Sequence, residues 1–119
     1  MEVINGCTLI APNSDPGFLR FGPAEVDGAY VAEIAAVPPG EPGPPLHLHP
    51  NTDEVFYIAE GEATFLLGDQ ELSLSSGGFV FVPRGVQHTV WNSGKGPLRG
   101  LIVISPGDAV HEFIPIETV

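Results

Sequence analysis

Three of the four histidines stand with a glutamate in two short stretches, a combination that suits one metal ion. The first stretch holds His47 and His49, then four residues and Glu54, and the second ends at His88. Imidazole and carboxylate groups are ordinary ligands of divalent transition metals. The sequence therefore predicts one divalent metal, iron, manganese, nickel, copper or zinc, held by these four residues, with positions left open for a substrate or water.

Short β-strands would place these four residues close together. Residues i and i+2 of a strand face the same way, about 6–7 Å apart, so His47 and His49 present two imidazoles on one side. Glu54 begins the next apolar run, and His88 begins a later one, after the turn at residues 83–85. Glu54 has two alternative roles: a permanent ligand, which we favour, or a labile ligand that accepts a substrate proton as the catalytic general base.

Short apolar or alternating runs, bounded by Gly, Pro, Asn or Asp, dominate the chain, and no window carries a helical stripe. Turn signals every 8–12 residues or so predict an all-β sandwich or barrel. The 119 residues are enough for one domain, spanning 1–119. Residues 1–29 are assigned to peripheral strands and loops. The predicted strands are residues 30–37, 46–49, 55–59, 63–67, 71–74, 79–82, 88–91 and 98–104.

The alternation of side chains predicts which residues surround the metal. Phe56 and Ile58 share the face of Glu54, and Val90 shares the face of His88, so these three apolar side chains are the expected substrate pocket. An apolar pocket with a few polar groups suits a planar, hydrophobic small molecule. Tyr57 and Trp91 fall on the opposite face, where they would pack under a second sheet or at a subunit interface.

Two predicted strands are apolar on both faces. Phe79–Val82 reads FVFV, and residues 101–104 read LIVI, so neither alternates with polar side chains. Strands of this kind are covered on both sides, by a second sheet or by another subunit. We therefore expect a homodimer.

Composition excludes some partners. Four Lys and Arg stand against fifteen Asp and Glu, a net charge of -11, which would repel nucleic acid and anionic lipid. No apolar stretch approaches the roughly 20 residues of a membrane span, and no signal peptide is recognisable. Cys7 is the single cysteine, so no intrachain disulfide can form. The default expectation is a cytoplasmic protein with no nucleic-acid or membrane partner.

The spacing of the two histidine stretches resembles the two motifs of the cupin superfamily. The first motif, at about residues 40–61, reads His47-x-His49-x4-Glu54-x6-Gly61. The second, at about residues 77–92, reads Gly77-x5-Pro83-x-Gly85-x2-His88-x3-Asn92. The chain departs from the first motif at the glycine expected before the first histidine. Gly40 stands one residue too far from His47, and Gly43 stands too near. The resemblance implies a cupin barrel of the double-stranded β-helix or jelly-roll type, with His47, His49, Glu54 and His88 as ligands of one metal.

The run from Glu54 to Asp69 and the run from Phe79 to Asn92 look like small single-domain bacterial cupins of the quercetin dioxygenase type and of polyketide pathways. That resemblance implies O2-dependent oxygenation or cleavage of a small aromatic or enol-containing molecule. Two alternatives stay open. One is a non-redox metal-dependent cyclase, isomerase or lyase acting on an enolisable, polyketide-like substrate. The other is a metal-dependent ligand-binding or sensory module without turnover. His111 lies outside both motifs, and its role is left open.

Overall fold

The computed structural model of the chain describes residues 2–12, 19–109 and 112–116. Within those residues the secondary structure is almost wholly antiparallel strands, as an all-β chain requires. No helix among them is long and apolar enough to cross a membrane. A four-residue helix, α1 (Pro23–Val26), and a 3-10 turn, Gly107–Ala109, are the helical pieces of the described chain. The strands are β1 (Glu2–Ile4), β2 (Cys7–Leu9), β3 (Leu19–Phe21), β4 (Val31–Val37), β5 (His47–Leu48), β6 (Asp53–Glu60), β7 (Glu62–Leu67), β8 (Gln70–Ser75), β9 (Phe79–Val82), β10 (His88–Asn92), β11 (Leu98–Ser105) and β12 (Ile114–Pro115).

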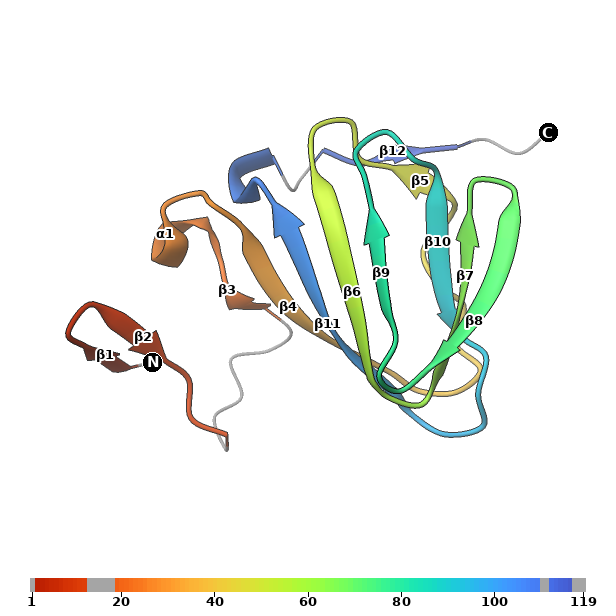
Figure 1. The fold of residues 1–119 in the computed structure, drawn as a ribbon, viewed down its shortest axis with the longest axis horizontal. Helices are drawn as coiled ribbons and strands as arrows, with labels where there is room; N and C mark the ends of the chain where they lie inside the picture. The colour runs from red at the N-terminus through yellow and green to blue at the C-terminus, as the bar shows by residue number, and fades with distance from the viewer. Residues whose placement is uncertain (1, 13–18, 110–111, 117–119) are drawn as a thin grey trace.

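Two five-stranded antiparallel sheets form the body of the described chain (Figure 1). Sheet I has the order β3-β4-β11-β6-β9, and sheet II has the order β12-β5-β10-β7-β8. Strands that are consecutive in sequence, such as β4 and β5 or β10 and β11, lie in opposite sheets, so the chain winds between the two walls. This is the double-stranded β-helix of a jelly-roll barrel, and it confirms the fold class expected from the sequence.

All eight strands predicted from the sequence exist, as β4 to β11, with ends shifted by at most two residues. The sequence did not resolve the terminal elements. Residues 2–9 form the hairpin β1–β2, turned by Asn5 and Gly6 at φ 49° and 80°. Asn-Gly is a strong signal for such a two-residue turn, because both positions need a positive φ. The dipeptide could therefore have located this hairpin.

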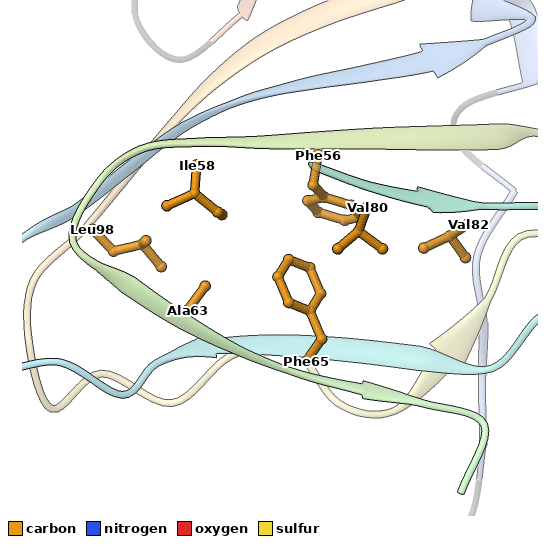
Figure 2. Packing of buried hydrophobic residues seen from close by; sticks show 7 residues of the cluster. All are labelled: Phe56, Ile58, Ala63, Phe65, Val80, Val82 and Leu98. Carbon is orange, nitrogen blue, oxygen red and sulfur yellow. The ribbon is translucent and has the colours of Figure 1, made fainter. Parts of the chain in front are cut away.

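Apolar side chains from both sheets fill the space between the two walls (Figure 2). Ala63 and Phe65 of β7 are fully buried, and they meet residues of β6, β9 and β11. Each large apolar side chain buried in this way contributes about 1.5–3 kcal/mol. A shared apolar core therefore holds together the two sheets that carry the site. Its buried residues are Phe56, Ile58, Ala63, Phe65, Val80, Val82 and Leu98.

Two glycines shape the loops beside the histidines. Gly85 has φ 84°, the left-handed conformation expected of this turn, and its N–H donates to the His49 carbonyl. Gly43 lies against β10, where an added Cβ would stand 1.8 Å from the Val90 carbonyl oxygen. Only glycine lets this proline-rich loop approach β10 so closely. The loop therefore keeps a glycine that its packing requires, although the position departs from the cupin motif.

Candidate metal centre

Three strands bring the predicted ligands together. His47 of β5 is the register partner of His88 of β10, which places their side chains next to each other in sheet II. His49 follows β5, and Glu54 lies on β6 of sheet I, facing the interior. All four side chains are buried, between 2% and 8% exposed. The structure therefore assembles at one end of the barrel four residues that are far apart in sequence.

The three histidines are positioned to bind a metal ion. One ring nitrogen from each of His47, His49 and His88 lies within 4.8 Å of those of the other two. Nitrogens bound at about 2.1 Å to one ion are roughly 3–4 Å apart, so only a small adjustment separates this arrangement from coordination. Glu54 falls outside this three-histidine set but contacts two of its members.

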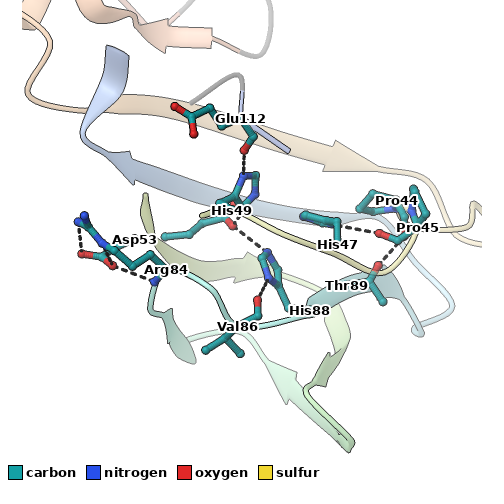
Figure 3. Close-up of polar contacts among 11 residues, drawn as sticks. Pro44, Pro45, His47, His49, Asp53, Arg84, Val86, His88, Thr89 and Glu112 are labelled. Atoms are coloured by element: carbon teal, nitrogen blue, oxygen red, sulfur yellow. Dashed lines mark hydrogen bonds and ion pairs between the residues drawn. The ribbon is translucent and has the colours of Figure 1, made fainter. Parts of the chain in front are cut away.

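Backbone carbonyls fix the orientation of all three imidazoles (Figure 3). Each ring places Nδ1 against a main-chain oxygen, where Nδ1–H donates. This bond directs the opposite nitrogen, Nε2, toward the centre of the cluster, an arrangement typical of histidines that ligate metals. The bonds run from His47 to Pro45 (2.7 Å), from His49 to Glu112 (2.9 Å) and from His88 to Val86 (2.9 Å).

Glu54 supplies a carboxylate where the imidazoles converge. Its Oε1 lies 3.0 Å from Nε2 of His88 and 3.5 Å from Nε2 of His49. The ring of His88 therefore has an acceptor at each nitrogen. Such a ring either carries two protons, or carries one proton and would offer Nε2 to a metal ion. The donor set thus fits a divalent transition metal.

Two of the histidines differ in proton affinity. Burial lowers the pKa of His47, the hydrogen bond with the Pro45 carbonyl partly opposes this, and the nearby His88 and His49 lower it further. Burial alone would also lower the pKa of His88, but the hydrogen bonds with Glu54 and with the Val86 carbonyl outweigh it and raise that pKa. In the metal-free chain the hydrogen bond with Glu54 thus favours the protonated form of His88.

An apolar cavity of about 280 Å³ opens beside the centre. Its polar part includes His47, Glu54 and His88 at the centre, and Glu41 of the proline-rich loop. The remaining lining is mostly aliphatic and aromatic, including all three residues expected from the sequence, Phe56, Ile58 and Val90.

Tyr57 and Trp91, which were expected on the face opposite the ligands, agree with that expectation only in part. The ring of Tyr57 packs on Phe79, with centroids 4.7 Å apart, which agrees with that expectation. Trp91 is nevertheless part of the cavity lining, and so is Tyr57. Strand parity alone did not predict that these two residues would line the cavity.

A second carboxylate, which was not predicted from the sequence, lies close enough to the centre to interact with Glu54 and His49. Glu33 of β4 lies in register with Ile102 of β11, which in turn pairs with Phe56, so it occupies the inner face of sheet I. Burial raises the pKa of Glu33, the charge of Glu54 raises it further, and His49 partly opposes them. The sequence could have indicated Glu33, because this residue is a single charged side chain at an inward position of an otherwise apolar strand.

The C-terminal segment also reaches the centre, which no motif had indicated. The Glu112 carbonyl accepts the bond from His49, and the Phe113 ring stacks on His47 with centroids 4.4 Å apart. Asn51 donates to the Glu112 carboxylate at 2.5 Å. His111 lies outside the described residues.

Arg84 is engaged at the rim of the barrel. Its guanidinium makes two hydrogen bonds of 3.2 Å to Asp53, whose carboxylate also accepts the Arg84 backbone N–H at 3.0 Å. These bonds hold the pKa of the Asp53 carboxyl below its usual value. The pair ties the turn before His88 to the start of the strand that carries Glu54.

Comparisons with known proteins identify the family. The profile of the cupin domain matches residues 33–104, which include both histidine stretches. The chain therefore belongs to the cupin family. A solved Klebsiella pneumoniae protein with a double-stranded β-helix domain is 26% identical, with a TM-score of 0.68, over 76% of this chain and 77% of that one. A Thermotoga maritima protein described as a predicted oxalate decarboxylase is 29% identical, with a TM-score of 0.64, over 70% and 71%.

A curated relative comes from a biosynthetic system. The tetracenomycin polyketide synthase protein TcmJ of Streptomyces glaucescens is 35% identical over 60 residues, 50% of this chain and 40% of the relative. The first two curated relatives are matched over only 40% and 56% of their lengths. These relatives therefore support the family and the fold.

Proposed function

We propose that this chain is a metal-dependent cupin enzyme that uses O2 to oxygenate or cleave a small aromatic or enol-containing molecule. The observation that carries the proposal is the convergence of three carbonyl-anchored imidazoles and Glu54 on one side of an apolar cavity. His47, His49, Glu54 and His88 would hold the metal. When bound, it would supply a Lewis acid that lowers the pKa of an enol or phenol and, if redox-active, a means of passing electrons to O2.

The cavity favours a neutral, planar substrate. Among the described residues that line it, none is a lysine or an arginine. A dicarboxylate or a sugar phosphate would place a second anionic group there without a counter-charge, which is costly in an apolar site. Phe56, Ile58 and Val90 would contact the rings and exclude water.

Glu54 would also move a proton. Its Oε1 lies within hydrogen-bonding distance of His88, so a proton that it accepts from a substrate hydroxyl stays within a paired, buried network. We favour its role as a ligand and assign proton transfer as an added role.

The second candidate is a non-redox cyclisation, isomerisation or elimination of an enolisable polyketide-like substrate. The similarity to TcmJ, a polyketide synthase protein, favours it. The same cavity and the same donor set would serve, because a metal held by these residues would supply the Lewis acid that this reaction also needs.

Oxygen uptake separates the two candidates. The full chain is stripped with a chelator, reloaded with Fe²⁺, Mn²⁺, Ni²⁺, Cu²⁺ or Zn²⁺, and assayed with flavonols, catechols and cyclic 1,3-diketones. We expect metal-dependent O2 consumption matched by product formation. Turnover that persists under strict anaerobiosis would overturn the oxygenase and support the second candidate. Stoichiometric ligand binding without product would overturn both and favour a sensory module.

A further inference from the structure

The C-terminal segment 112–116 contacts the metal centre from the side of β5. Its strand β12 pairs antiparallel with β5, joining Ile114 to Leu48 and Pro115 to His47 in register (Figure 1). The N–H of Ile116 donates to the Leu46 carbonyl at 2.8 Å. Backbone hydrogen bonds therefore hold the segment against β5, the strand that begins with His47.

Two residues of this segment touch the ligands themselves. The Glu112 carbonyl is the acceptor that orients the His49 imidazole, at 2.9 Å (Figure 3). The Phe113 ring stacks on His47, with an interplanar angle of 23°, and meets the edge of His49 at 6.1 Å. Of the three ligand histidines, His47 and His49 thus depend on the segment for packing or orientation.

Asn51 fixes the start of the segment. Its amide donates to the Glu112 carboxylate at 2.5 Å, so Glu112 is held through its side chain while its carbonyl serves His49. The matched cupin profile ends at residue 104, so this arrangement lies beyond the part of the chain that defines the family.

We infer that the segment 112–116 is a positioning element of the metal centre, in which Glu112 and Phe113 hold His49 and His47 in the geometry that binds the ion. The inference rests on the proposed metal site but not on the reaction. Hydrogen-bond partners that orient ligand histidines typically change metal affinity by about 10–100-fold when they are removed. Phe113 covers one face of His47 and limits its rotation.

Binding of Co²⁺ alone to the metal-free chain tests this inference, because its absorption spectrum reports the ligand geometry. A variant that ends at Ala109 removes the segment, and a variant that lacks only residues 117–119 is its control. We expect the first to raise the Co²⁺ dissociation constant about 10–100-fold and to alter the visible spectrum, and the control to do neither. Unchanged affinity and spectrum in the chain that ends at Ala109 would overturn the inference.

Point variants keep the test decisive if the shortened chain fails to fold by circular dichroism. Phe113→Ala should weaken Co²⁺ binding several-fold, and Phe113→Tyr, which restores an aromatic face, should recover it. Asn51→Ala should act in the same direction through Glu112. If Phe113→Ala and Asn51→Ala both bind Co²⁺ as the intact chain does, the inference is wrong and the metal site stands. If the intact chain binds no Co²⁺, both the inference and the proposed metal site fail.

Discussion

The two faces of sheet I have similar side chains and opposite environments. On β6, the inward residues Glu54, Phe56 and Ile58 are only 4–6% exposed. On the outer face of β9, Phe79 and Phe81 are 67% and 60% exposed. The inner face carries the carboxylate of Glu54, although apolar side chains usually face the core and charged ones face solvent. The outer face holds large aromatic residues in the open.

The difference shows that a side chain of sheet I is buried when another layer of the protein covers its face, whatever the type of the side chain. Sheet II closes the inner face, and a buried carboxylate is tolerated there because His49 and His88 pair with it. Among the described residues, no second layer covers Phe79 and Phe81 on the outer face. The homodimer expected from the sequence would supply that layer, and it stays a prediction.

The strongest effect on metal binding should come from removing one of the predicted ligands inside the barrel. His49→Ala should raise the metal dissociation constant by more than about 100-fold and abolish turnover, because loss of a direct ligand exceeds the loss of an outer partner. Val55→Ala, on the outer face of β6, should leave metal binding near that of the parent chain. Competition with a chromophoric chelator measures both, and unaltered binding by His49→Ala would refute the metal-site assignment.

The two regions should also differ in how much free energy of unfolding is lost when an aromatic ring is removed from the core or from the exposed outer face. Phe65 is fully buried, so Phe65→Ala should lower the free energy of unfolding by about 3–5 kcal/mol. Phe81→Ala should change it by about 0.5 kcal/mol in dilute protein, since most of that ring is already in water. Urea unfolding of the metal-free chains gives both values. Equal losses would mean that the outer face is covered even in dilute solution.

The third prediction concerns what covers the outer face. Light scattering should give the mass of two chains, and Phe81→Asp should shift it to the mass of one, because a charge cannot be buried in an apolar interface without a partner. Val3→Asp is a suitable control, since Val3 is 66% exposed on β1, outside sheet I. A parent chain with the mass of one subunit would contradict the homodimer.

The smallest expected effect comes from the second carboxylate of the inner face. The pKa of Glu33 is raised in the folded chain, mainly by burial, so its contribution to stability is greatest at acidic pH and is lost as pH rises through that pKa. In the metal-free protein, Glu33→Gln should therefore increase stability slightly at neutral pH and flatten the dependence on pH. Glu71→Gln, on the exposed β8, should do neither in thermal unfolding between pH 4 and pH 8.

Much of the fold was accessible from local patterns. Strands β4 to β11 were predictable because each is a short apolar run between turn residues. The β1–β2 hairpin was not predicted, although Asn5-Gly6 marks its turn. Strand β12 was not predicted because a strand of two residues has no periodic pattern of side chains. Glu33 was overlooked although its parity points inward. Glu112 and Phe113 could not have been found, since a backbone carbonyl and a single ring reach the centre only through long-range pairing with β5.

The sequence by itself determined the donor set, the strand periodicity and the cupin motifs, because residue type and spacing are local properties of the chain. The tertiary structure alone decided which carbonyl orients each imidazole, and that the acceptor for His49 comes from 63 residues away. It also decided which apolar face of sheet I is closed and which is open. These features depend on contacts between distant segments, and such contacts exist only once the two sheets have packed together.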